Sequence, residues 1–168
     1  CLMPNHIHCV AVPENSRSLA LGFGKTHERF ARLINRRNGW TGHLWQERFY
    51  SVPMDRKHTI AALRYVLRNP VRAGLVERPH DWPHSSARTH LGLVEDPLIQ
   101  KGTLAGLVDD WPTFLSVEER STMRDALRRC TRTGRPVGNS GFVAILERQL
   151  GRRLRPRPAG RPPRQPTS

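Results

Sequence analysis

The run Pro4–Val12 constrains the fold of this chain more than any other segment. Its apolar residues are typical of a buried β-strand, and two histidines, His6 and His8, flank Ile7. Successive side chains of a strand point to opposite faces, so both imidazoles share one face and Ile7 lies on the other. Two such imidazoles can hold one metal ion. The alternative is that both are polar residues at a strand edge.

The charge of the chain favours a polyanionic partner. The 168 residues include 28 Lys and Arg against 14 Asp and Glu, which gives a net charge of +14. Residues 1–90 carry 14 basic and 6 acidic side chains, residues 91–133 carry 6 and 7, and residues 134–168 carry 8 and 1. Two basic segments joined by a neutral one fit two separate contacts with nucleic acid.

The three cysteines indicate a reducing compartment. Cys1, Cys9 and Cys130 form no Cys-x-x-Cys pair and no even set, which is typical of free thiols in a cytoplasmic protein. The sequence shows no signal peptide and no apolar run long enough to span a membrane. We therefore expect a cytoplasmic protein.

A basic amphipathic helix is predicted from Thr26, a good N-cap residue, to Arg37, with Gly39 just beyond its end. Apolar residues repeat on one face of this helix, and arginines occupy the other. Arg36 and Arg37 contact phosphates if that face meets DNA, and are merely solvated if it does not.

A strand and a second helix follow. Aromatic and β-branched residues predict the strand over residues 44–52. Trp45 and Arg48 in this strand would stack on a base and hold a phosphate, although a half-buried strand would use the same aromatic residues for packing. Asp55 is a good cap for the helix over residues 56–68.

Tyr65 and Asn69 lie four positions apart, so one helical turn brings their side chains to the same place. Pro70 disfavours helix at the residue before it, which predicts that the helix ends near Asn69. Structural roles are open to both residues. Tyr65 can be half buried against the sheet, and Asn69 can cap the short turn 70–74.

The C-terminal half gives weaker signals. Ser116 and Glu119 form a capping box that predicts a helix to about Cys130. A further helix is predicted over residues 141–150, and together the two suggest a helical hairpin. Residues 152–168 are rich in Arg and Pro and are expected to be disordered.

Four blocks of the sequence occur in an order and spacing that resemble a known family. They are Met3-Pro4-Asn5-His6-Ile7-His8, Gly42-His43-Leu44-Trp45-Gln46-Glu47-Arg48-Phe49, Leu63-Arg64-Tyr65-Val66-Leu67-Arg68-Asn69-Pro70-Val71-Arg72-Ala73-Gly74-Leu75-Val76 and Asp81-Trp82-Pro83-His84-Ser85-Ser86. Over roughly residues 3–90 the chain resembles the REP-associated tyrosine transposases, a branch of the single-tyrosine HUH transposases. The resemblance implies an α+β, ferredoxin-like HUH endonuclease fold with a central antiparallel sheet. We expect the strand-helix-strand unit that precedes the histidine motif in the family to be missing here.

The resemblance also implies a chemistry. His6 and His8 match the family's ligands for a divalent metal, Mg or Mn, Tyr65 matches the nucleophile, and Asn69 sits where the family has a third, polar ligand. The family cleaves single-stranded DNA beside a hairpin and forms a 5′-phosphotyrosine link that a free 3′-hydroxyl resolves. The residues expected to contact DNA are Arg36, Arg37, Trp45, Arg48, Arg64, Arg68 and Arg72.

These expectations define three segments and leave two alternatives. Residues 1–90 form an N-terminally incomplete catalytic domain, residues 91–133 a helical extension, and residues 134–168 a basic helix with a tail. The protein would act as a monomer or a homodimer. One alternative is a DNA-hairpin-binding protein without cleavage activity. The other is a metallohydrolase that uses water, which the sequence disfavours because no second His-Asp or His-His cluster follows.

Overall fold

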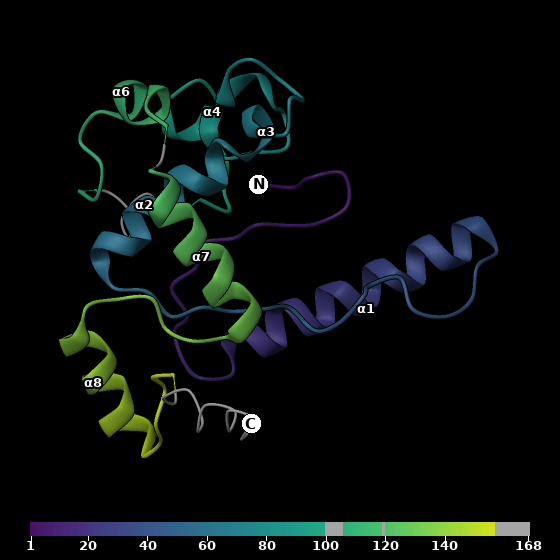
Figure 1. The fold of residues 1–168 in the computed structure, drawn as a ribbon. Coiled ribbons are helices and arrows are strands. Elements are labelled where there is room, and N and C mark those ends of the chain that lie inside the picture. Colours follow the sequence, from purple (N-terminus) through teal and green to yellow (C-terminus); the bar gives the residue numbers. More distant parts are fainter. Residues whose placement is uncertain (100–105, 119, 157–168) are drawn as a thin grey trace, which may run out of the picture.

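The computed structural model describes residues 1–99, 106–118 and 120–156 (Figure 1). Within these ranges all regular structure is helical: seven α-helices and one short 3-10 helix. The helices are α1 (Ser18–Asn38), α2 (Arg56–Leu67), α3 (Asn69–Arg72), η1 (Pro79–Asp81), α4 (Ala87–His90), α6 (Trp111–Ser116), α7 (Ser121–Thr133) and α8 (Ser140–Leu150).

The predicted ferredoxin-like fold with a central antiparallel sheet is wrong for the described residues. The histidine run makes only an isolated antiparallel bridge, between Leu2 and Ile7, and residues 44–52 have no regular structure. A strand is stable only when its backbone N–H and C=O groups pair with a neighbouring strand. Neither segment meets such a neighbour in the described part of the chain, so its β-propensity has no ladder to join.

The core forms around α2. Leu63 and Leu67 of this helix pack against Ala87 of α4 and against Phe114 and Leu115 of α6. All five side chains are almost completely buried. Helix α7, from the predicted helical extension, also packs against α2. Helix α2, which carries Tyr65, is therefore held by helices that follow it in the sequence.

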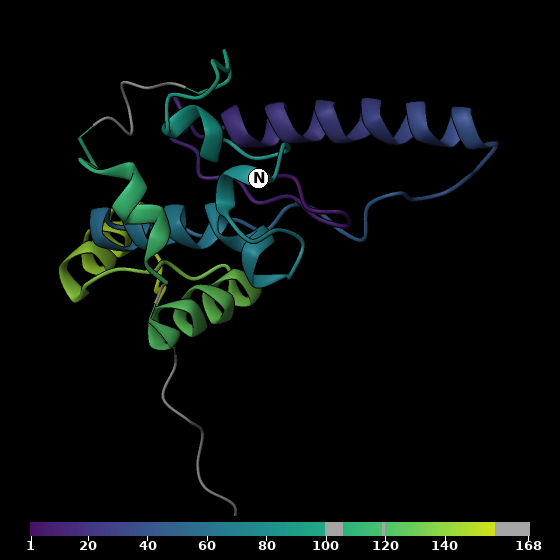
Figure 2. The same ribbon diagram turned by 90° about the horizontal axis from the view of Figure 1, so that it is seen from above.

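Helix α1 projects away from this core, and the chain that follows it runs back alongside it (Figures 1 and 2). The helix begins at Ser18, upstream of the predicted cap Thr26, and none of its residues is buried. It ends as predicted at Gly39, which adopts a left-handed conformation with φ of 65° and donates its N–H to the Asn35 carbonyl. Glycine adopts this conformation without strain because it has no Cβ.

Asp55 joins the start of α2 to the start of α8. One carboxylate oxygen accepts the His58 N–H at 2.9 Å, which confirms the predicted cap, and the other accepts the Asn139 N–H at 2.9 Å. Beside it, Val137 donates its N–H to the Pro53 carbonyl at 2.9 Å and accepts the Asp55 N–H at 3.2 Å. These contacts connect two segments that lie far apart in the sequence.

The C-terminal helices differ in part from the prediction. Ser116 ends α6 rather than capping the next helix, and its predicted partner Glu119 lies outside the described residues. Helix α7 begins at Ser121, and α8 occupies the predicted place. Residues 152–156 fold back against α8, whereas the rest of the predicted disordered tail lies outside the described residues. None of the described helices is long and apolar enough to cross a membrane.

Candidate active site

The N-terminal residues form a closed loop that positions the two histidines. The Cys1 amine donates to the His8 carbonyl and the His8 N–H donates to the Cys1 carbonyl, both at 2.9 Å. Trp82 fixes the loop to the rest of the chain because its indole Nε1 donates to the Leu2 carbonyl at 2.8 Å. The Leu2 N–H in turn donates to the His84 carbonyl at 2.8 Å. The segment Asp81–Ser86 therefore anchors the histidine loop.

The imidazoles of His6 and His8 converge. Their Nε2 atoms are 3.1 Å apart. His6 Nδ1 lies 2.6 Å from Asn5 Oδ1, an oxygen that can only accept, so this nitrogen carries a proton. Two nitrogens bound at ~2.1 Å and at right angles to one metal ion lie about 3.0 Å apart. The 3.1 Å separation lies within hydrogen-bond range, and it is also compatible with two adjacent positions around a single ion.

The protonation state of His8 suits the same role. Burial lowers the pKa of His8 to about 4, and the nearby charges of His6, the N-terminus and Arg72 act in the same direction. His8 is therefore neutral near pH 7. Metal binding requires neutral imidazole, because a protonated ring has no lone pair to offer.

Tyr65 reaches the histidines from α2. Its ring centroid is 5.6 Å from that of His8, and the two rings meet edge to face at 81°. Arg72, at the end of α3, places its guanidinium carbon 4.1 Å from the centroid of the Tyr65 ring. This is the geometry of a cation–π contact. The rings of His6, His8 and Tyr65 and the Arg72 guanidinium thus form one cluster.

Asn69 lies behind this cluster and is only 6% exposed. Its Oδ1 accepts a hydrogen bond from Arg72 Nη2, and its Nδ2 is buried with no hydrogen-bond partner among the described residues. The Arg72 hydrogen bond thus uses one of the two lone pairs of this oxygen. In the described chain no group of three or more His, Cys, Asp or Glu side chains is placed to hold a metal. Asn69 therefore holds the Arg72 side chain in place, and the role of Asn69 as a metal ligand stays a prediction.

Comparison with known proteins identifies relatives of this chain. A protein of Haemophilus influenzae is 33% identical over 97 residues, which cover 51% of this chain and 55% of the relative. A protein of Escherichia coli K12 is 26% identical over 86 residues, which cover 51% and 50%. Both are named REP-associated tyrosine transposase. The resemblance to REP-associated tyrosine transposases is confirmed. The chain spans about half the length of these curated relatives. No protein-family model and no solved structure matches it.

The DNA contacts expected from the transposase resemblance fall in separate places. Arg64 of α2 and Arg68, the residue that follows α2, bind α6. Arg64 donates to the Phe114 carbonyl at 3.0 Å and lies over the Phe114 ring, and Arg68 donates to the Leu115 carbonyl. These bonds satisfy carbonyls at the end of α6, which gives both guanidiniums a structural role. Their contact with DNA stays a prediction.

The other predicted transposase contacts lie on α1 and on the chain that returns from it. Arg36 and Arg37 are exposed in the last turn of α1, at the end that points away from the core (Figure 1). Trp45 stacks on the His27 ring at a centroid distance of 4.1 Å and donates to the His27 carbonyl at 3.1 Å. Its indole therefore anchors the returning chain to α1, and Arg48 is exposed on that chain.

Sequence reasoning missed three functions that depend on contacts. Asn5 sets the tautomer of His6, Trp82 anchors the histidine loop, and Arg72 covers the Tyr65 ring. All three residues stand inside the blocks that carry the family resemblance. Their presence in those blocks was the available signal, but it did not indicate what each side chain does.

Proposed function

We propose that this chain carries the nicking site of a REP-associated tyrosine transposase. The observation that supports the proposal is the meeting of His6, His8 and Tyr65, which come from two distant segments. The names of both relatives support DNA transposition as the process. In this proposal the substrate is single-stranded DNA beside a hairpin, and Tyr65 is the nucleophile.

The proposed reaction starts from a phosphodiester whose negative charge repels an oxygen nucleophile. A Mg or Mn ion held by His6 and His8 would supply neutralisation of that charge. The Tyr65 oxygen attacks phosphorus, the bond from phosphorus to the 3′-oxygen breaks, and the leaving oxygen takes a proton to become a 3′-hydroxyl. The products are a 5′-phosphotyrosine and a free 3′ end. The covalent link keeps the bond energy, so a second 3′-hydroxyl can reseal the strand.

Arg72 has two tasks in this proposal. Its guanidinium holds the Tyr65 ring against the His8 edge, and it adds a fixed positive charge beside the attacked phosphate. A free tyrosine side chain has a pKa of about 10 and is a weak nucleophile near pH 7, so the attack depends on positive charge that neutralises the phosphate. The hydrogen bond to Asn69 Oδ1 fixes the guanidinium in this position.

The test is a denaturing gel. The chain is incubated with labelled single-stranded hairpin DNA and Mn or Mg, and a slowly migrating protein–DNA adduct is expected. Tyr65→Phe should abolish the adduct. Tyr50→Phe is the matched control because Tyr50 is the other tyrosine of the chain and is exposed. An adduct that persists in Tyr65→Phe refutes the assignment of the nucleophile.

A DNA-hairpin-binding protein without cleavage activity is the second candidate. It is favoured by the hydrogen bond from Arg72 to Asn69 Oδ1, because this bond leaves the oxygen one lone pair fewer for a metal ion. This candidate predicts salt-sensitive binding in wild type and in Tyr65→Phe, with no adduct under any metal. A metallohydrolase would instead release cleaved DNA without an adduct, and Tyr65 would be dispensable.

A further inference from the structure

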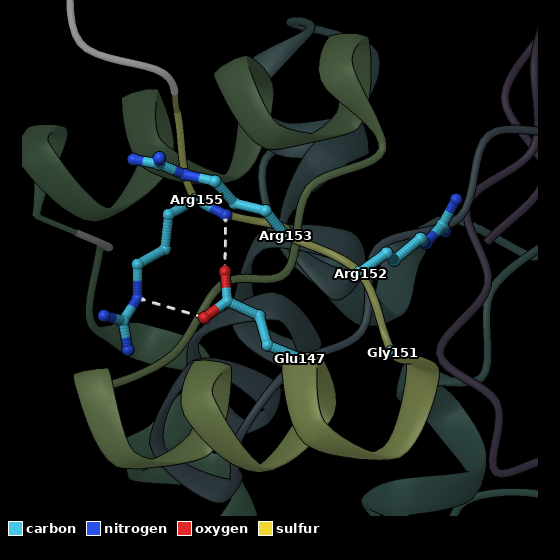
Figure 3. A pocket seen from close by; sticks show the side chains of 5 residues that line it. All are labelled: Glu147, Gly151, Arg152, Arg153 and Arg155. Carbon is cyan, nitrogen blue, oxygen red and sulfur yellow. Dashed lines mark hydrogen bonds and ion pairs between the residues drawn. The ribbon is translucent and has the colours of Figure 1, made fainter.

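Four arginines line two hollows at the C-terminal end of α8, and three of them, Arg152, Arg153 and Arg155, lie around the Glu147 carboxylate (Figure 3). This group, here called the arginine pocket, consists of Arg135, Arg152, Arg153, Arg155 and Glu147. Helix α8 lies apart from the N-terminal loop that carries the histidines (Figures 1 and 2). The arginine pocket is therefore distinct from the proposed nicking site.

The Glu147 carboxylate binds groups of the protein itself. Glu147 Oε1 accepts the N–H groups of Leu154 at 2.8 Å and Arg155 at 3.1 Å, and Oε2 lies 3.6 Å from Arg155 Nε. The two backbone N–H groups lower the pKa of Glu147, so the carboxylate stays ionised. These bonds fold the chain back against α8 after Gly151. Glu147 thus builds the arginine pocket and cancels only a part of its positive charge.

Two of the guanidiniums are held in place by backbone carbonyls. Arg155 Nη2 donates to the Ser140 carbonyl at 3.1 Å, and Arg153 Nη2 donates to the Pro156 carbonyl at 3.1 Å. Each guanidinium has five N–H donors, so these contacts use a minority of them. Side chains ordered in this way lose less conformational freedom when an anion binds.

Two hollows open beside these side chains. One, of about 380 Å3, is lined by Arg152, Arg153 and Arg155 together with Glu147 and Gly151. The other, of about 440 Å3, is lined by Arg135, Arg153, Arg155, Leu154 and Pro156. Arg153 and Arg155 line both hollows, and Figure 3 shows them extending to one side of Glu147 while Arg152 extends to the other. Each hollow is large enough for a phosphate group.

We propose that the arginine pocket binds the phosphate backbone of nucleic acid as a second contact, separate from the Tyr65 site. Planar guanidiniums hold phosphate oxygens in pairs, and all basic side chains of residues 134–168 are arginines. No aromatic side chain lines either hollow, so the contact recognises phosphates and not bases. Because it involves neither histidines nor Tyr65, the inference does not depend on the proposed nicking reaction.

The test measures binding of a fluorescein-labelled single-stranded oligothymidylate to the full chain by anisotropy across a salt series. The variant is Arg135→Gln with Arg153→Gln, which leaves the Glu147–Arg155 pair intact. The control is Arg128→Gln with Arg129→Gln, two exposed arginines of α7 that remove the same charge elsewhere. We expect the pocket variant to lose on the order of tenfold in affinity, and the slope of log K against log salt to fall by about 1.4, as for two single-strand phosphate contacts.

Equal losses of affinity in the two variants overturn the proposal, because they would show that only the net charge of the protein matters and not the position of the arginines. Circular dichroism checks that both variants fold. Competition with inorganic phosphate distinguishes a site for a nucleic-acid backbone from a site for small anions. If it displaces the oligonucleotide only at much higher concentration, the site takes a polymer backbone. If it binds as tightly as the oligonucleotide, the site is one for small anions and the nucleic-acid assignment is refuted. Loss of the denaturing-gel adduct alone refutes only the nicking proposal.

Discussion

Asp55 is the residue whose removal tests the fold most directly. In the Asp55→Ala variant α2 loses its N-cap, which costs about 1 kcal/mol. The Asn139 N–H also loses a charged acceptor, at a further ~1.5–3 kcal/mol. The Asp55–His58 contact is short, at 2.6 Å, and both side chains are largely shielded from solvent. We therefore expect the free energy of unfolding to fall by about 3 kcal/mol.

The measurement is urea unfolding followed by circular dichroism, with two comparison variants. Asp110→Ala removes a cap with only one backbone partner, the Thr113 N–H, and should cost about 1 kcal/mol. Asp109→Ala alters an exposed neighbour and should have almost no effect. If Asp55→Ala costs no more than Asp110→Ala, Asp55 is only a cap and does not join α2 to α8.

The same residue predicts how stability depends on pH. Desolvation alone would raise the pKa of Asp55, but hydrogen bonds from His58 and Asn139 outweigh it and lower the pKa below the usual 3.8. A carboxylate with a depressed pKa stabilises the fold above the unfolded value, and this contribution is lost as pH falls through the folded one. Wild type should therefore lose stability below about pH 4, and Asp55→Ala should lose less over that range. Equal acid sensitivity in both would contradict the reasoning.

Substitutions at four further positions test the geometry. A Cβ at Gly138 would lie 2.3 Å from a Phe142 ring carbon, so Gly138→Ala should lower the free energy of unfolding by about 1–3 kcal/mol. Gly22→Ala, in open space within α1, should instead raise it by up to ~1 kcal/mol, and urea unfolding separates the two signs. Arg72→Ala should slow adduct formation at least tenfold, and Arg72→Lys should recover a part of that rate. The affinity for DNA should fall less than the rate. Equal losses in rate and affinity would make Arg72 only a binding residue. Trp82→Ala should weaken Mn binding several-fold, measured by calorimetry, with helix content preserved; unchanged binding would mean that the indole does not hold the histidine loop.

Helices whose ends are set by neighbouring residues were predictable from the sequence. Asp55 caps α2 through His58, three positions later, and Gly39 ends α1 by a contact with Asn35. Helix α1 begins earlier than predicted and runs through Gly22 and Gly24, because each glycine inside a helix costs only about 1 kcal/mol. The lack of a sheet in the described residues was not predictable in the same way. A strand needs a partner, and β-propensity in residues 44–52 does not reveal whether a partner is present.

The candidate site was predicted by residue type but not by contact. The spacing of His6 and His8 and the family resemblance together indicated that Tyr65 belongs with the histidines, and the structure places them in one cluster. The hydrogen bond from Arg72 to Asn69 depends on how α3 follows α2, which no local pattern specifies. For the same reason the sequence did not indicate that the Asn69 oxygen accepts a hydrogen bond from Arg72.

The contact between Asp55 and Asn139 has a consequence for how the protein is made. The two residues are separated by 84 positions, so a ribosome adding about 5–20 residues per second needs roughly 4–17 s to move from one to the other. During that interval Asp55 can bind the His58 N–H but not the Asn139 N–H, which has not yet been translated. Helix α2, which carries Tyr65, therefore lacks one of its tertiary contacts. Slow codons between these positions would lengthen this exposed interval without changing any residue of the finished protein.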